Sequence, residues 1–266
     1  MYDITKTVYG VARDLAKSMD IKMERLINTT LNEKYDISVS TNMNPGTLEW
    51  FALGLKYDSL VDNGTLNISE VRHLPTDGNV YIPIPFFAKP VSEELTSLEK
   101  DSYGLFKQIV IDGVSYNCPY LKRITERGTI VSIKDVTYKD GKYDVDKFNS
   151  INADVLSPKV EVGIDTYSDI MEHVAVKSYV HIELTMDEVN NIMLASDLLY
   201  PDMVEADRHT ISEVALVSGI DDIPICAQVD YFAKIDKPLY QWNTKDKTLT
   251  TLYLGGMMPR VKNRKL

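Results

Sequence analysis

Two neighbouring stretches decide the fold: ISEVALVSG at residues 211–219 and AQVDYFAKIDKP at residues 227–238. Both are rich in β-branched and aromatic residues, and a turn signal, Gly219 with Asp221 and Asp222, lies between them. Pro238 cannot donate to a β ladder and should end the second strand. The apolar strand positions fit for a packed core are Ile211, Val214, Leu216, Val229 and Tyr231. Two adjacent strands are therefore predicted, over 211–217 and 225–232.

Glu213 interrupts the apolar positions of the first stretch. A charged residue there must be exposed or paired, since an isolated buried carboxylate is costly. Lys234 and Lys237 are candidate partners.

Further strand signals lie upstream and downstream of this pair. Residues 129–138 are rich in Ile, Val and Thr, and Lys139-Asp140-Gly141-Lys142 predicts a hairpin turn into 143–145. Residues 106–111, 174–184 and 249–254 also have strand character, and 48–55 is a strand or a short helix. Two prolines at alternate positions in 81–87 exclude a helix and a central strand, so this segment is an edge or an extended connector.

Helices are predicted at three places besides this β framework. Thr185-Met186-Asp187-Glu188 fits a capping box for a helix that runs to Tyr200, just before Pro201. A short capped helix is expected over 92–98. At the N-terminus, apolar residues recur at helical spacing, with Asp3 as the expected cap: Ile4, Val8, Val11, Leu15 and Met19. The pattern continues over 23–31.

The apolar stripe of the first helix has two interpretations. It lies on the chain's own core, or it docks on a partner subunit, and periodicity does not separate them. The fold class that these elements predict is α+β. An N-terminal helical segment, residues 1–40, precedes a mainly antiparallel, sandwich-like β domain with an inserted helix, residues 41–266.

Composition limits the classes of partner. The chain has 266 residues with Lys plus Arg 29 and Asp plus Glu 39, so its net charge of −10 disfavours nucleic-acid contact. The dense basic group at 260–265 is interpreted as a solvated tail. Cys118 and Cys226 stand far apart in the sequence and match neither a disulfide framework nor a zinc motif. Two isolated cysteines of this kind are typical of proteins in a reducing compartment. Neither a signal-peptide pattern nor an apolar run of membrane-spanning length is recognised, so we expect a soluble protein with no membrane contact.

Reactive signatures are sparse. His181 and Glu183 fall on one face of a predicted strand and are the nearest approach to a metal or general-base site. The pair matches the HxE of zinc deaminases, but the PCxxC that those enzymes need is missing. Asp221-Asp222 is interpreted as a solvated turn instead of a cation site. We therefore expect no catalytic, cofactor-binding or metal-binding residues.

One arrangement resembles a known kind of protein. Residues 179–190, then 211–219, then 227–238 and Tyr240-Gln241-Trp242 follow the order of a β module in tail-collar, fibre and other structural proteins of tailed phages. There an "I-x-E-[IV]-[GA]-L" strand is followed by an apolar-aromatic strand and a "K-P" corner. Here Ala215 replaces the usual glycine, and the acidic loop carries an inserted helix from about 192 to 207. The likeness covers about a third of the chain.

This resemblance implies a structural component of a tailed-phage particle, at the neck or collar, the tail or the baseplate. It would be located in the virion, assemble with other virion structural proteins and form a homo-oligomeric ring. The 16 tyrosines favour an interaction protein, because tyrosine is common at interfaces. Two other classes stay open: a cytoplasmic binding or regulatory module, and a carboxylate-dependent hydrolase that uses His181 and Glu183.

Overall fold

The structure is a computed structural model of the whole chain. It describes residues 4–20, 31–37, 47–55, 73–139, 142–148, 170–220, 226–239, 248–254 and 257–260. Several expectations fall outside these ranges: the helical pattern over 23–30, the turn residues 140–141 and 221–222, and the basic tail from residue 261.

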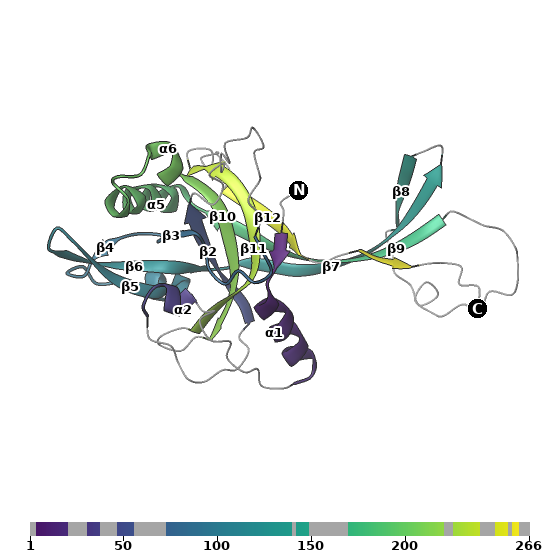
Figure 1. The fold of residues 1–266 in the computed structure, drawn as a ribbon, viewed down its shortest axis with the longest axis horizontal. Helices are drawn as coiled ribbons and strands as arrows, with labels where there is room; N and C mark the ends of the chain where they lie inside the picture. Colours follow the sequence, from purple (N-terminus) through teal and green to yellow (C-terminus); the bar gives the residue numbers. More distant parts are fainter. Residues whose placement is uncertain are drawn as a thin grey trace, which may run out of the picture. The chain divides into compact units, whose positions relative to one another are not determined.

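The chain is mainly antiparallel β-sheet with a few helices (Figure 1), which confirms the coarse α+β expectation. The helices are α1 (Val8–Ser18), α2 (Leu31–Lys34), α3 (Ser97–Ser102), α5 (Met186–Leu199) and α6 (Glu205–Arg208). The strands up to residue 123 are β1 (Ile4–Lys6), β2 (Thr47–Leu55), β3 (Ile82–Ile84), β4 (Lys89–Pro90), β5 (Tyr103–Ile111) and β6 (Val114–Arg123). The later strands are β7 (Glu126–Lys139), β8 (Lys142–Phe148), β9 (Ile170–Leu184), β10 (Thr210–Ile220), β11 (Cys226–Pro238), β12 (Thr248–Leu254) and β13 (Met257–Arg260).

Two compact units divide the chain. One consists of Met1–Thr125 with Ile182–Thr250, and the other of Glu126–His181 with Thr251–Leu266. The domain boundary expected at residue 40 stays a prediction, but α1 and α2 belong to the same unit as the larger sheet.

The larger sheet has eight strands, and its main path runs β1-β11-β10-β2-β6-β4, with β3 on β2 and β5 on β6. The strands predicted over 211–217 and 225–232 lie in β10 and β11, which pair with each other antiparallel. β10 is also paired with β2, so 48–55 is a strand and not a helix. The side chains of β10 and of β2 from Trp50 onward are buried along both faces of the sheet. The proline-containing segment 81–87 provides β3, which pairs only with β2 among the described strands.

The smaller sheet has the order β12-β9-β7-β8, with β13 on β9. Lys139 is paired with Lys142, so β7 and β8 form the hairpin that the sequence predicted around 139–142. β9 and β12 lie where strands were expected, over 174–184 and 249–254.

Helix boundaries follow their caps. α5 begins after Thr185, whose side chain and Glu188 form the predicted capping box. The helix expected over 92–98 is wrong in position: α3 begins at Ser97, because a second capping box forms between Thr96 and Glu99. The N-terminal helix also starts later than expected. Residues 4–6 are a strand on β11, and Thr7, not Asp3, caps α1 by accepting from the Gly10 N–H.

Three of the described tyrosines lie in the core and not at the surface. Tyr9, Tyr35 and Tyr120 are buried, and the rings of Tyr35 and Tyr120 stack with centroids 4.4 Å apart. The core around that pair comes from α2 and the central strands, and includes Leu31, Trp50, Ala52, Leu121, Ala215, Val217, Val229 and Phe232. The number of tyrosines is therefore a weak indicator of an interface.

Candidate functional site

The first helix presents its apolar stripe to solvent. Val8, Val11, Leu15 and Met19 are 49%, 44%, 59% and 66% exposed, while Tyr9, Gly10, Arg13 and Ala16 are buried on the opposite side. This finding overturns the interpretation in which the stripe lies on the chain's own core. The face that packs on the sheet is the one with a glycine, an alanine and an arginine.

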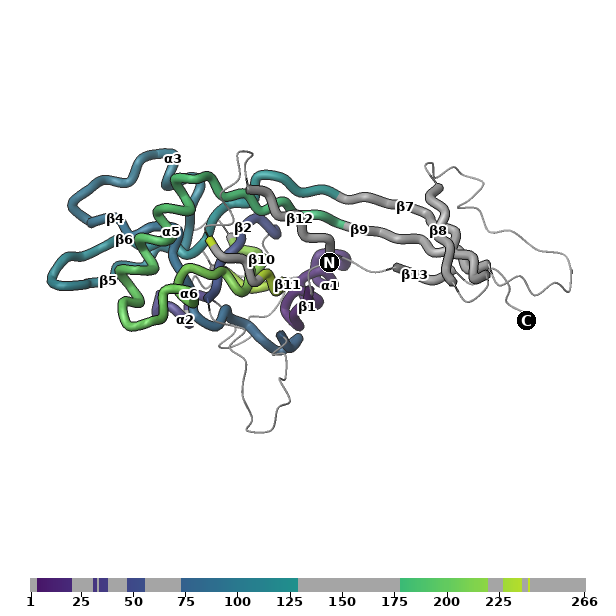
Figure 2. The backbone as a smooth tube through the Cα atoms, turned by 90° about the horizontal axis from the view of Figure 1, so that it is seen from above, coloured from purple at the N-terminus to yellow at the C-terminus, as the bar shows by residue number. Residues whose placement is uncertain are grey.

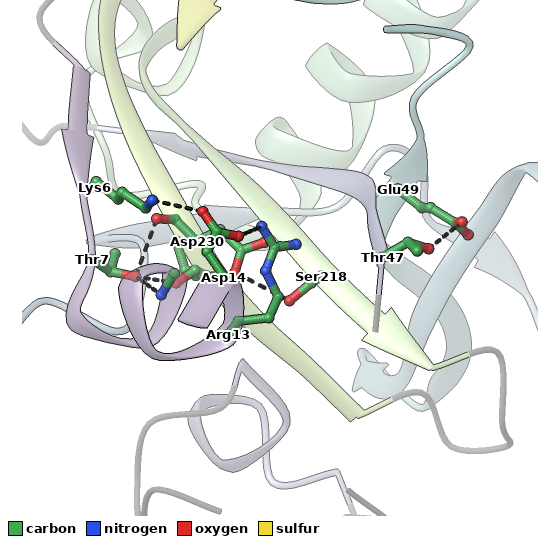
Figure 3. Close-up of polar contacts among 10 residues, drawn as sticks. Lys6, Thr7, Arg13, Asp14, Thr47, Glu49, Ser218 and Asp230 are labelled. Carbon is green, nitrogen blue, oxygen red and sulfur yellow. Dashed lines mark hydrogen bonds and ion pairs between the residues drawn. The ribbon is translucent and has the colours of Figure 1, made fainter. Parts of the chain in front are cut away.

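The buried side of α1 is fixed to β11 by a group of polar contacts (Figure 3). Arg13 Nη1 lies 3.0 Å from Asp230 Oδ2, with the Asp230 side chain fully buried and the Arg13 side chain 7% exposed. Ser218 Oγ donates to Asp230 Oδ1 at 3.2 Å. Asp14 bridges Arg13 and Lys6 at 2.8 Å and 2.6 Å. Since a buried charge without a partner is costly, this pairing holds the helix in one orientation.

Backbone contacts bring the helix close to the strand. Thr7 N donates to the Asp230 carbonyl at 2.9 Å, and Thr7 Oγ1 donates to the Val229 carbonyl at 2.6 Å. A Cβ built on Gly10 would lie 2.5 Å from the Asp230 carbonyl oxygen, closer than side chains tolerate. Gly10 is therefore required by packing, even though glycine weakens a helix.

The charges at this anchor are strongly perturbed. Burial raises the pKa of Asp230 to about 7, against the opposing effects of Arg13 and the Ser218 hydrogen bond. Burial acts to raise the pKa of Asp14 too, but the hydrogen bond from Lys6 and the charge of Arg13 outweigh it and the pKa is lowered. The anchor is thus sensitive to pH through Asp230.

A second buried polar cluster surrounds Glu213. Its side chain is fully buried, His73 Nε2 lies 2.9 Å from Glu213 Oε2, and the Tyr81 N–H donates to Glu213 Oε1. The His73 ring stacks on Phe232, with centroids 4.1 Å apart. The sequence suggested Lys234 or Lys237 as the partner; Lys234 lies opposite Glu213 in the register, but the ion pair is made with His73. This pair secures the 73–81 segment to the sheet.

His181 and Glu183, the nearest approach to a reactive site in the sequence, have different surroundings in the structure. His181 lies opposite Glu126 in the β7–β9 ladder, with Nε2 3.3 Å from Glu126 Oε1. His181 belongs to the smaller unit and Glu183 to the larger one, where the Glu183 carbonyl accepts from Lys122 Nζ at 2.8 Å. Within the described ranges, no three His, Cys, Asp or Glu side chains are arranged to hold a metal ion.

An open depression of about 680 Å³ is lined by Asp101, Ser102, Lys122, Arg123, Ile124 and Thr125. Its two cations are already engaged: Lys122 Nζ is 2.6 Å from Glu188 Oε1, and Arg123 Nη1 is 3.0 Å from Glu49 Oε2. The Arg123 guanidinium also lies 4.3 Å from the centre of the Trp50 ring. Glu188 is the capping-box residue of α5, so its contact with Lys122 joins α5 to β6. The contacts of Arg123 with Glu49 and Trp50 join β6 to β2, so both cations have a structural role.

The extended segment 81–87 does not offer its aromatic side chains to a neighbour. Ile84 and Phe86 are buried, and Phe86 N donates to the Pro119 carbonyl at 2.9 Å. Tyr81 alone among its aromatic residues is well exposed. The candidate functional surface is therefore the outward stripe of α1.

Sequence signals for the anchor were present but were not interpreted. Asp230 stands inside an apolar strand, and a carboxyl group there needs a hydrogen-bond or ion-pair partner. Gly10 and Arg13 lie on the same side of the helix, opposite the stripe. Reading these three residues together would have predicted which face of α1 points outward.

Comparisons with known proteins define the class. A family model described as "Family of unknown function (DUF7208)" matches residues 2–230. The chain belongs to this family, and the match includes both α1 and its anchor in β11. Neither a curated protein nor a solved structure matches the chain. None of the helices within the described ranges is long and apolar enough to cross a membrane.

Proposed function

We propose that this chain is a structural component of a tailed-phage particle, at the neck or collar, the tail or the baseplate. It acts through static contacts with other virion structural proteins and is arranged with its copies in a ring. The observation that carries the proposal is the outward, uncharged stripe of α1. An exposed apolar face that is held rigidly on the sheet is suited to docking.

The segment that is bonded to the start of the helix carries one more exposed apolar residue. Val8 N donates to the Pro75 carbonyl at 2.8 Å, and the adjacent Leu74 is exposed. These five apolar residues are fewer than the roughly 20–30 residues that each partner contributes to a stable interface. A small patch is adequate where many subunits make the contact together, because multivalency multiplies weak contacts. This size favours a role in an assembly over a tight binary complex.

The β10–β11 hairpin supplies the second support. Its strands contain the residues that resemble the phage module, and Lys237 is paired with Ile211 beside the Lys-Pro corner. We propose in addition that the module has a sandwich-like core. The burial of both faces of β2 and β10 supports this, because a sheet buried on both faces needs a layer on each side.

The test compares two stripe variants with a matched control in particles of the phage that encodes the chain. Val11→Asp and Leu15→Asp place a charge in the stripe, whereas Leu194→Asp changes an exposed leucine on α5. We expect all three to melt within a few degrees of wild type. Quantitative mass spectrometry of purified particles should show copy number reduced about tenfold or more for the stripe variants only, because burying a charge at the contact costs several kcal/mol.

The same measurement separates the alternatives. A cytoplasmic binding or regulatory module would be missing from purified particles. Wild-type chain absent from particles would reject the proposal. Stripe variants present at normal copy number would reject the docking role of α1.

A further inference from the structure

β5 is an edge strand of the larger sheet. It pairs with β6 from Tyr103 opposite Lys122 to Ile111 opposite Val114, and the other side of β6 is taken by β2 and β4. No strand in the described part of the chain pairs with the outer side of β5. Figure 2 shows the β5–β6 hairpin with β5 on the side away from β4.

The turn geometry identifies the backbone groups that face outward. Asp112 and Gly113 have φ of 49° and 79°, as in a two-residue type I′ turn, so Ile111 and Val114 form the first hydrogen-bonded pair. Alternation along an antiparallel ladder then points Ile109 and Lys107 inward, and Val110, Gln108 and Phe106 outward.

An independent observation supports this assignment. Phe106 lies opposite Pro119, which has no N–H to give, and the Pro119 carbonyl accepts from Phe86 N on the other side of β6. Phe106 therefore does not exchange hydrogen bonds with Pro119. Each of the three outward residues presents one N–H and one C=O, which makes six backbone groups on one free edge.

This edge lacks the usual protection against pairing. Edge strands are normally shortened, charged, bulged or interrupted by proline. Here the irregularity is at Leu105, with φ 53°, before the outward run begins. Lys107 is the one charged residue in 106–111, and its backbone groups face β6. Val110, at the exposed end, is 69% exposed.

We propose that β5 pairs antiparallel with β5 of a second copy of this chain, about a two-fold axis at Gln108. In this register Phe106 of each copy lies opposite Val110 of the other, and Gln108 lies opposite itself. All six outward groups of each strand are then hydrogen-bonded. The side chains are also compatible across the two strands. The two Gln108 amides face each other at the centre, and on each side of them the ring of Phe106 lies opposite the smaller side chain of Val110.

Neighbouring registers are excluded by the same features. A shift that places Gln108 opposite Val110 puts Phe106 against Asp112, which is in the turn and has the wrong φ for a ladder. A shift the other way leaves Val110 unpaired or against Gly104, beyond the irregularity at Leu105. The register at Gln108 also keeps Lys107 opposite Ile109 and avoids two like charges face to face.

The contact is a weak one by itself. A single strand-to-strand contact buries less than a standard interface, and two copies with a net charge of −10 each repel one another at low salt. Dimerisation is therefore strengthened by salt and by high local concentration. The inference stands whether or not the chain is a virion protein, because it concerns only the chain and its own copy.

Cysteine cross-linking tests the register in the full-length chain. Facing residues of a hydrogen-bonded pair have Cα atoms about 5.5 Å apart, within the range of a disulfide. Gln108→Cys should give a covalent dimer under mild oxidation at high salt. Val110→Cys, on the same edge and face, should cross-link at least about tenfold less. The chain also has two native cysteines, the buried Cys118 and Cys226, which could form other disulfides. Peptide mass spectrometry therefore has to show which two cysteines are joined.

Sedimentation velocity tests the pairing without a cross-link. Wild type should shift from monomer toward dimer with concentration and with salt. Gln108→Pro removes an outward N–H and no backbone bond to β6. The bond to β6 that it loses is the exposed side-chain hydrogen bond from Gln108 Nε2 to Asn117 Oδ1, at 3.4 Å. The variant should therefore melt near wild type and remain monomeric. A wild type that stays monomeric at high concentration and salt would overturn the proposal. So would equal cross-linking of both cysteine variants, or an unchanged dimer in a folded Gln108→Pro variant.

Discussion

The Arg13 guanidinium lies 3.0 Å from the carboxylate of Asp230, in a place where neither side chain has appreciable contact with solvent. This one ion pair determines which face of α1 is buried. Because Arg13 must reach β11, Val8, Val11 and Leu15 are turned away from the sheet. The surface proposed for docking is thus a consequence of a buried salt bridge on the opposite face.

Arg13→Met should therefore be strongly destabilising. It leaves Asp230 buried without its cation, and breaking a buried pair on one side costs about 3–5 kcal/mol. Replacing both partners, as Arg13→Met with Asp230→Asn, should recover most of the loss because no charge remains. Urea unfolding at about pH 8 measures both. Equal losses in the single and the double variant would mean that the pair does not hold the helix.

Stability should depend on pH through Asp230. Burial raises the pKa of this carboxyl from 3.8 to about 7, so between these values the folded state holds a proton that the unfolded chain has released. The contribution of Asp230 is present below about pH 4 and is lost as pH rises through about 7. The free energy of unfolding should therefore fall over this window.

Asp230→Asn isolates that contribution. The variant should have a smaller decline in unfolding free energy from about pH 5 to about pH 7.5 than wild type, measured by urea titration at each pH. Carboxyls such as Asp14 and Glu188 act in the opposite direction and at lower pH. Their pKa values are lowered by lysine partners in spite of burial, so their contributions are lost on acidification. Parallel curves for the two proteins would contradict the prediction.

Gly10→Ala should destabilise the chain although alanine is the better helix former by about 1 kcal/mol. The added methyl group would meet the Asp230 carbonyl at 2.5 Å, and backbone on both sides cannot move aside cheaply. We expect a net loss of about 1–3 kcal/mol in urea unfolding. Val11→Ala, on the exposed face of the same helix, is the control and should be close to neutral. A Gly10→Ala variant as stable as wild type would show that α1 is not closely seated.

The sequence predicted the strands better than the surfaces. β10 and β11 were predictable because β-branched residues and a turn signal agree there, and α5 because a capping box marks its start. The orientation of α1 was not predictable from apolar periodicity, since the helix has two distinct faces and the less apolar one is buried. Glu213 could be recognised as paired, but its partner His73 is far away in sequence, and long-range contacts leave no local signal.

Leu216→Asp should unfold the larger unit. Leu216 is fully buried in β10 between β2 and β11, and an unpaired buried carboxylate costs several kcal/mol, comparable to the stability of a whole domain. Val214→Asp should behave in the same way. Leu194→Asp on the exposed face of α5 is the control and should fold normally. Circular dichroism melting distinguishes them, and cooperative, soluble folding of Leu216→Asp would contradict the burial of β10.

His181→Ala and Glu183→Ala should leave the function of the chain unchanged. The imidazole of His181 is paired with Glu126 across two strands at 3.3 Å, a partly exposed pair worth about 1 kcal/mol. Catalysis or metal binding would need a third group that orients or completes the pair. We therefore expect both variants to enter particles at wild-type copy number and to melt within a few degrees of wild type.

The decisive measurement is elemental analysis of the purified chain. A stoichiometric metal that a chelator removes, and that is lost in His181→Ala, would restore the hydrolase interpretation and count against a purely structural role.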